Sequence, residues 1–81
     1  MKITLLYFAQ LRESLGKNSE EFTSAEPLTG KELIEALVAR YPQMEAVAGS
    51  IQLAVNGEYF RVEQILPDSA EVALIPPVSG G

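Results

Sequence analysis

The sequence contains no cysteine, no histidine and no tryptophan. Without cysteine the chain cannot form a disulfide, so nothing in it points to an oxidising compartment. Without histidine or cysteine it lacks the residues of a typical zinc site and of a nucleophile activated by a neighbouring histidine. We therefore expect no metal site. The groups left for chemistry are carboxylates, lysines, hydroxyls and the end of the chain.

Positive charge is also scarce, because six basic residues stand against eleven acidic ones and the net charge is −5. The basic residues are not clustered, so we expect binding neither to nucleic acid nor to an anionic membrane. An apolar run over residues 3–9 is too short to span a bilayer, and Gln10, Arg12 and Glu13 follow it where a signal peptide would have a small-residue cleavage site. We expect a cytoplasmic protein.

The length of 81 residues suffices for one domain with one compact core, and 47% of the residues are hydrophobic. The expected elements are a strand over 2–8, a short helix over 9–15, a strand over 19–24, a main helix from 30 to about 40, a helical turn within 43–48, a strand over 51–55, its hairpin partner from 58, and a last strand over 71–75. One amphipathic helix against one mixed sheet predicts an α+β domain with two layers.

Three local patterns set the boundaries of these elements. Thr29 and Glu32 have the spacing of a capping box at the start of the main helix, and Pro42 ends that helix at about residue 40 or 41. Asn56-Gly57 predicts a two-residue hairpin turn, because both positions of such a turn need φ > 0. The adjacent Glu20 and Glu21 point to opposite faces of a strand, so we interpret them as a solvated edge and not as an acid/base pair.

Alternation along the strands predicts an apolar surface on the face of the sheet that the helix does not cover. Leu6 and Phe8 of the first strand, Tyr59 of the hairpin and Ile75 of the last strand have the parity of this face. Exposed apolar patches on small proteins often mark partner surfaces. Ile75 also lies directly before the end of the chain, so we interpret these four residues as a partner surface.

The last six residues, over 76–81, predict a flexible tail that leaves the sheet. Pro76 and Pro77 have no amide hydrogen and stiffen the exit, whereas Gly80 and Gly81 carry no side chain. Six extended residues reach roughly 20 Å at about 3.3 Å each, long enough to enter a narrow channel in a partner. Two terminal glycines alone would suggest only a frayed end, but an apolar strand anchors these. The one reactive group there is the carboxylate of Gly81.

The chain resembles the small subunit of molybdopterin synthase, a sulfur carrier with the ubiquitin-like β-grasp fold. The resemblance covers the whole chain and is carried by the stretches over 7–13, 54–56 and 71–81, of which the family pattern P-P-V-[ST]-G-G at 76–81 is the most specific. The chain departs from the family at Asp68-Ser69-Ala70, where the family often has D-G-D. We expect this difference to affect only the geometry of a turn.

The resemblance implies a chemical role for the tail. A separate adenylating enzyme would use ATP to activate Gly81, and sulfur would then replace AMP to give a thiocarboxylate. The tail, with Pro77, Val78, Ser79 and Gly80 leading to Gly81, would insert into the large synthase subunit and donate sulfur to the pterin precursor of molybdenum cofactor biosynthesis. The large subunit would hold the catalytic residues, so this chain would be a non-catalytic subunit with no bound cofactor.

The same resemblance implies a heterotetramer of two large and two small subunits, with Phe8, Tyr59 and Ile75 at the contact with the large subunit. Three alternatives remain open from the sequence. One is the thiamine-biosynthesis sulfur carrier, which shares the fold and the Gly-Gly end but is usually shorter and lacks the Pro-Pro-Val-Ser lead-in. Another is a ubiquitin-like modifier whose Gly81 is conjugated to lysines of target proteins. The third is a plain interaction domain with an inert tail.

Overall fold

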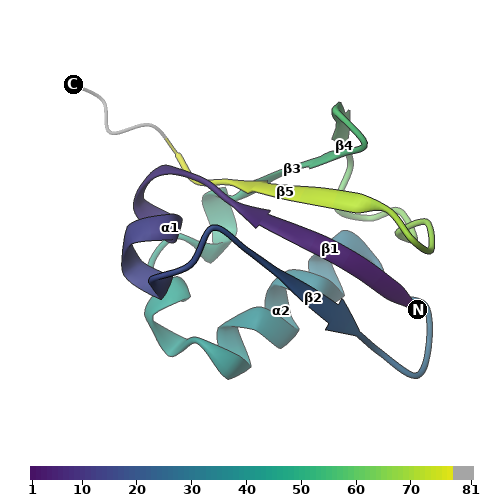
Figure 1. Cartoon of the computed structure of the whole chain (residues 1–81), viewed down its shortest axis with the longest axis horizontal. Helices are drawn as coiled ribbons and strands as arrows, with labels where there is room; N and C mark the ends of the chain where they lie inside the picture. Colours follow the sequence, from purple (N-terminus) through teal and green to yellow (C-terminus); the bar gives the residue numbers. More distant parts are fainter. Residues whose placement is uncertain (78–81) are drawn as a thin grey trace.

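The computed structural model describes residues 1–77 of the chain (Figure 1). Its strands are β1 (Lys2–Tyr7), β2 (Ser19–Thr23), β3 (Gln52–Val55), β4 (Glu58–Phe60) and β5 (Glu71–Ile75). Its helices are α1 (Ala9–Leu15) and α2 (Gly30–Arg40), followed by two short 3-10 helices, η1 (Pro42–Met44) and η2 (Ala48–Ser50). Every predicted strand and both predicted α-helices are present, and the helical turn expected within 43–48 is replaced by η1 and η2. None of the helices formed by these residues has the length and apolar character needed to cross a membrane.

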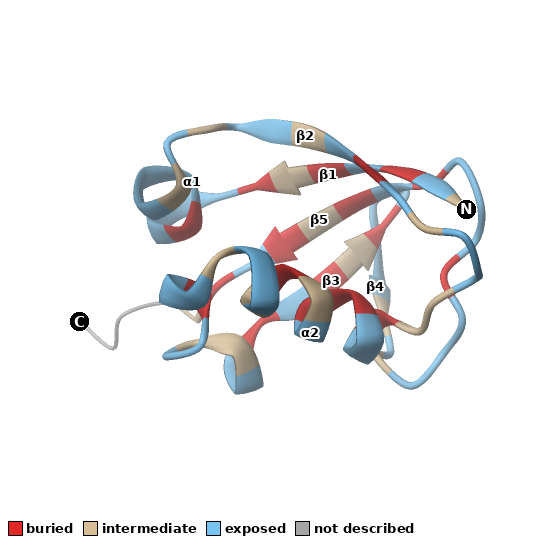
Figure 2. Cartoon of the chain, turned by 90° about the horizontal axis from the view of Figure 1, so that it is seen from below, coloured by how far each residue is buried: buried red, intermediate tan, exposed pale blue. Residues whose placement is uncertain are grey.

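The five strands form one mixed sheet in the order β2-β1-β5-β3-β4. β1 and β5 are neighbours and run parallel, whereas the other three pairs are antiparallel. Figure 2 shows α2 lying across the strands, with buried residues on the side of the helix that faces them. The α+β prediction with a mixed sheet packed on one main helix is confirmed.

The core lies between α2 and the face of the sheet that it covers. Along β1, buried residues alternate with more exposed ones, as the period of a half-buried strand requires. Ile3, Leu5 and Tyr7 are each at most 2% exposed. From the helix, Leu33 and Leu37 are completely buried against this face. The opposite face of the sheet, called the outer face below, carries the alternate residues.

The start of α2 has the predicted capping box. The Thr29 hydroxyl accepts a hydrogen bond from the amide of Glu32 at 3.1 Å, and the Glu32 carboxylate accepts one from the amide of Thr29 at 2.9 Å. These bonds satisfy amides that would otherwise have no partner in the helix. The helix ends at Arg40, two residues before Pro42, also as predicted. Local signals therefore determine both ends of the main helix.

At Gly30, the start of α2 packs closely against the segment that follows β4. The amide of Lys31 donates to the carbonyl of Val62 at 2.9 Å. A Cβ on Gly30 would lie 2.7 Å from Leu53 Cδ1 and 3.0 Å from Val62 Cα. The second contact involves backbone, which cannot turn away as a side chain can.

We expect Gly30→Ala to lower the free energy of unfolding by about 1–3 kcal/mol, the usual cost of overpacking a close contact. Urea denaturation followed by circular dichroism measures the change. Gly49→Ala is the matched control, because nothing lies within 4 Å of its added Cβ, and it should stay within about 0.5 kcal/mol of the wild type. Equal stability of the two variants would contradict the close-packing account.

Two positions depart from the sequence expectation through their backbone. The first strand ends at Tyr7 and not at Phe8, because Ala9 adopts a left-handed conformation with φ 50° and turns the chain into α1. Ser69, where the family often has glycine, has φ 64°. Asp68 Oδ1 accepts hydrogen bonds from the amides of Lys2 and Ser69, so the turn before β5 is held by a side chain although its left-handed residue is not glycine.

Candidate functional site

The outer face carries a continuous row of small and apolar side chains across four strands. Leu6 pairs with Ala73, Ala73 with Ala54, and Ala54 with Tyr59. Paired residues in neighbouring strands point to the same face. The two alanines leave the centre of the row low, so Leu6 and Tyr59 stand at its two ends.

Next to this row, Phe8 and Ile75 lie at the end of the sheet where the chain leaves it. Ile75 pairs with Gln52 and is 40% exposed, and Phe8 directly follows β1 and is 44% exposed. Tyr59 is 73% exposed and Leu6 is half-buried. We call Leu6, Phe8, Tyr59 and Ile75, joined by Ala54 and Ala73, the outer-face patch. The structure thus exposes the three residues predicted as the partner interface, and their role in binding stays a prediction.

The base of the tail is anchored in the domain. Pro76 is buried and Pro77 is half-buried, although the strand ends at Ile75. On one side, the Gln10 side-chain nitrogen donates to the carbonyl oxygen of Pro77 at 3.4 Å. Another side borders a shallow hollow of about 310 Å³, lined by Ser50, Gln52, Ile75, Pro76 and Pro77. The predicted tail residues Val78, Ser79, Gly80 and Gly81 lie outside the described residues.

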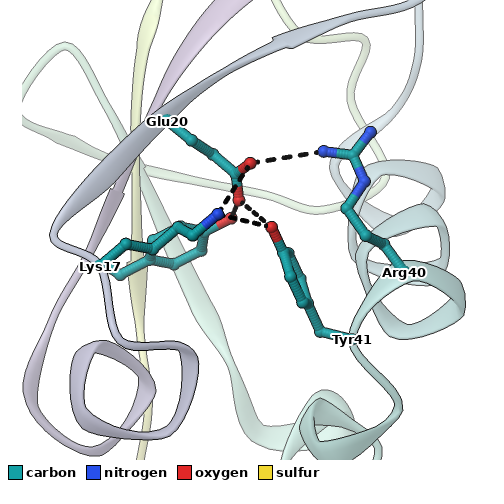
Figure 3. Close-up of polar contacts among 5 residues, drawn as sticks. Lys17, Glu20, Arg40 and Tyr41 are labelled. Atoms are coloured by element: carbon teal, nitrogen blue, oxygen red, sulfur yellow. Dashed lines mark hydrogen bonds and ion pairs between the residues drawn. The ribbon is translucent and has the colours of Figure 1, made fainter.

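Glu20 is the centre of a polar cluster that the sequence did not predict. Its Oε2 accepts hydrogen bonds from the hydroxyls of Tyr7 at 2.5 Å and Tyr41 at 2.8 Å. Its Oε1 lies 3.4 Å from Arg40 Nη1 and 3.7 Å from Lys17 Nζ (Figure 3). The interpretation of Glu20 as a solvated edge residue was wrong, because β2 turns this side chain towards Tyr7 and the end of α2, where 16% of it is exposed. For Glu21, whose side chain is 67% exposed, it was right.

The surroundings of Glu20 act on its pKa in opposite directions. Burial raises it, but the hydrogen bonds from Tyr7 and Tyr41 and the charges of Lys17 and Arg40 lower it more, so the pKa of Glu20 lies below its usual value. Burial, together with the bond to Glu20, raises the pKa of Tyr7 far above its ordinary range. At neutral pH the cluster therefore contains an ionised carboxylate and a neutral Tyr7. It ties β1, β2 and the end of α2 together.

We expect Glu20→Gln to lower the free energy of unfolding at pH 7 by about 1–2 kcal/mol, because hydrogen bonds to an ionised group are roughly twice as strong as neutral ones. Since the folded-state pKa is depressed, this stability is present above the unfolded pKa of about 4.3 and is lost as the pH falls through the folded-state value. Urea denaturation at pH 7 and pH 3 should show the two proteins converging in acid.

The neighbouring substitution Glu21→Gln is the matched control for that experiment. Glu21 lies 3.6 Å from Lys2 Nζ, and both side chains are well exposed. Exposed pairs contribute about 0–1 kcal/mol, so this variant should unfold nearly as the wild type does. A difference between Glu20→Gln and the wild type that stayed constant from pH 7 to pH 3 would contradict the role of the charged carboxylate.

Within residues 1–77, the other charged residues and hollows offer no competing reactive centre. Arg12 and Glu13 are exposed on α1. A larger hollow of about 400 Å³ lies near the start of α2 and is lined by Lys31, Ile34, Glu35, Ala48, Gly49, Ile51, Val62 and Glu63. Its charged groups are one lysine and two glutamates, and no group of three potential metal ligands occurs among residues 1–77. We therefore place the candidate site at the tail base and the outer-face patch.

Sequence reasoning also missed two features of the surface. Ile65 is 58% exposed in the segment after β4, where it forms an isolated bridge with Thr29. The irregular stretch that contains it gave no strand pattern from which its exposure could be predicted. Gln10 gave no signal beyond ending the apolar run over residues 3–9, and its bond to Pro77 joins residues 67 positions apart. Only the packing of α1 beside β5 shows it.

Comparison with known proteins places these features in a family. Residues 5–81 match the model of the ThiS family. A molybdopterin synthase sulfur carrier subunit of Chlamydomonas reinhardtii is 37% identical, with all of both chains covered. SAMP1, the small archaeal modifier protein 1 of Haloferax volcanii, is 28% identical with a TM-score of 0.82 over all of both chains.

One further match concerns a chain solved together with another subunit. It belongs to a complex of subunits 1 and 2 of molybdopterin-converting factor from Helicobacter pylori 26695. The likeness has a TM-score of 0.68 over all of both chains, and at 21% identity it supports the fold alone. The ubiquitin-like β-grasp fold, the family match over residues 5–81 and the relative matched over its full length agree. The chain belongs to the ThiS family and, by its likeness to curated relatives, to the family of molybdopterin synthase sulfur carrier subunits.

Proposed function

We propose that this protein is the sulfur carrier subunit of a molybdopterin synthase, and that it carries sulfur as a thiocarboxylate on Gly81. The full-length match at 37% identity to a relative of that name carries the proposal. The anchored tail base and the adjacent outer-face patch support it, because the segment that leads to Gly81 leaves the domain beside an exposed apolar surface. The sulfur acceptor would be the pterin precursor, cyclic pyranopterin monophosphate.

The proposed chemistry needs only one group of this chain. A carboxylate is a poor electrophile, so a separate adenylating enzyme first joins it to the α-phosphate of ATP and pyrophosphate leaves. A donor at the oxidation level of hydrosulfide then attacks the acyl carbon, AMP leaves, and loss of a proton gives the thiocarboxylate. The thiocarboxylate sulfur is a good nucleophile at neutral pH and would form a bond to a carbon of the precursor as a carbon–oxygen bond of the precursor breaks. Water would then cleave the bond between the acyl carbon and sulfur, so that the sulfur stays on the pterin and Gly81 returns to a carboxylate. Repetition on two carrier molecules would supply both sulfurs of the dithiolene.

The large subunit is the partner we assign to the outer-face patch. Interfaces are enriched in aromatic residues at their centres, and Phe8 and Tyr59 are exposed together with Ile75. The relatives' names describe this chain type as a subunit, and the Helicobacter pylori structure pairs a chain of this fold with a second subunit. We propose a heterotetramer of two large and two small subunits, located in the cytoplasm.

Intact-mass analysis after incubation with an adenylating enzyme, ATP and a sulfur donor tests the proposal. The mass should rise by the difference between one sulfur and one oxygen atom, and the gain should disappear when ATP is omitted. The same incubation with a variant lacking Gly80 and Gly81 should give no gain. If the full chain stays unmodified beside a carrier that the same enzyme does sulfurate, the proposal fails.

The likeness to SAMP1 favours a second candidate function, conjugation of Gly81 to lysines of other proteins. The first step, adenylation of the terminal carboxylate, is common to both functions. Denaturing gels of cell extracts probed for this chain separate them. A ladder of larger species would indicate a modifier, whereas a single band at 8.8 kDa is expected for a dedicated carrier. A thiamine-pathway carrier would also give a single band, but it would pass no sulfur to the pterin precursor.

A further inference from the structure

The parallel pairing of β1 with β5 brings the start of α1 to the base of the tail. The last pair in the register is Tyr7 with Leu74, so the C-terminal ends of both strands lie side by side. One chain continues into Phe8 and α1, and the other into Ile75 and Pro76. Figure 1 shows α1 at the end of the strands where the chain leaves β5. A residue in the first turn of α1 is therefore close to the tail base.

The left-handed conformation of Ala9 places Gln10 in the first turn of α1. Ala9 has φ 50°, a conformation that costs a residue with a Cβ roughly 1–2 kcal/mol. Such a conformation persists only where the surrounding structure holds it. Leu11, which is 2% exposed, anchors the helix in the core two residues later. The chain therefore reverses sharply after β1, and the side chain of Gln10 lies beside β5 and not further along the helix.

The backbone of the tail base has few hydrogen-bonding groups that could fix its position. Pro76 and Pro77 have no amide hydrogen, so they can be fixed through hydrogen bonds only by donors that reach their carbonyl groups. The side-chain nitrogen of Gln10 supplies such a donor to the carbonyl of Pro77. Pro76 is buried and needs no further anchor, whereas Pro77 is the last described residue and only half-buried.

We propose that Gln10 is a positioning residue of the sulfur carrier, which sets the direction in which the tail leaves the domain. This inference rests on the proposed function. Four residues separate Pro77 from the end of Gly81, a reach of roughly 13 Å at about 3.3 Å each. A change of direction at Pro77 is magnified over that distance. Gln10 takes no part in the chemistry. It would raise the fraction of encounters in which the tail enters the partner's channel in a productive orientation.

Gln10→Leu and Gln10→Glu test this role, because one removes the donor and the other replaces it with an oxygen that repels the carbonyl. The matched controls are Gln64→Leu and Gln64→Glu, since Gln64 is also exposed and lies in the segment after β4. The first readout is 15N relaxation at the amide of Val78, which follows Pro77. The second is the KM for the carrier in sulfur loading and in sulfur transfer, measured beside kcat and thermal unfolding.

We expect both Gln10 variants to move the Val78 relaxation towards faster motion and to raise KM about threefold, within the range for one neutral hydrogen bond. The kcat and the unfolding temperature should stay at the wild-type values, as in the Gln64 controls. Unchanged relaxation, or unchanged KM, would overturn the inference. If the wild type itself accepts no sulfur, the proposed function fails, whereas the relaxation readout still decides whether Gln10 holds the tail base.

Discussion

A single alanine added after Gly81 is expected to abolish sulfur loading, with the fold unchanged. The added residue converts the Gly81 carboxylate into a peptide bond and moves the free carboxylate one residue, about 3.3 Å, further out. It also adds a Cβ directly after the two bare glycines, and residues without Cβ permit the closest approach of channel walls. Intact-mass analysis of the loading reaction should show no gain in mass for this variant.

The same alanine added before Met1 is the matched control. It changes the mass equally and leaves the Gly81 carboxylate free. The amino terminus donates a hydrogen bond to the carbonyl of Ser24 at 2.7 Å, so thermal unfolding of both extended proteins should be compared with the wild type. Loading of the C-terminally extended protein at the wild-type rate would contradict a mechanism through the carboxylate of Gly81.

Ile75→Asp is expected to weaken binding to the large subunit by about thirtyfold or more, the effect of losing an interface residue worth about 2 kcal/mol. Ile75 is 40% exposed, belongs to the outer-face patch and directly precedes the buried Pro76. An aspartate there would have to be desolvated without a partner when the complex forms. Isothermal titration calorimetry measures the dissociation constant, and Phe8→Asp provides a second test at the residue that directly follows the neighbouring strand β1.

Ile65→Asp is the matched control for that experiment. Ile65 is an exposed isoleucine, but its backbone pairs with Thr29 at the start of α2 and not with a strand of the sheet. The substitution Ile65→Asp therefore makes the same chemical change outside the outer-face patch. We expect wild-type affinity for this variant. If Ile65→Asp weakened binding and Ile75→Asp did not, the interface would lie near α2, and the assignment of the outer-face patch would be wrong.

Local signals in the sequence were sufficient for most of the fold. The capping box of Thr29 and Glu32 is formed as predicted, and Asn56 and Gly57 both have positive φ in the hairpin turn. Parity along the strands also placed Tyr59 and Ile75 on the outer face. These predictions succeed because each depends on neighbours in sequence or on the alternation of a strand, and neither requires knowledge of which strands pair.

Most of the features that the sequence did not reveal depend on distant residues. Glu20 is held by Tyr7 from β1 and by Tyr41, which follows α2, so its burial depends on the edge pairing of β2. The bond between Gln10 and Pro77 requires the parallel pairing of β1 with β5. The left-handed φ of Ala9 has no sequence signal, because alanine favours the interior of a helix and gives no indication of such a turn.

The most direct test of the account is a single-turnover transfer reaction. The protein, first loaded with sulfur, is mixed with the large subunit and cyclic pyranopterin monophosphate, and both protein and pterin are followed by mass spectrometry. We predict that the protein returns to its carboxylate mass as the pterin gains sulfur, with one sulfur leaving each carrier. A carrier that keeps its sulfur in the presence of a competent large subunit and precursor would contradict the central claim.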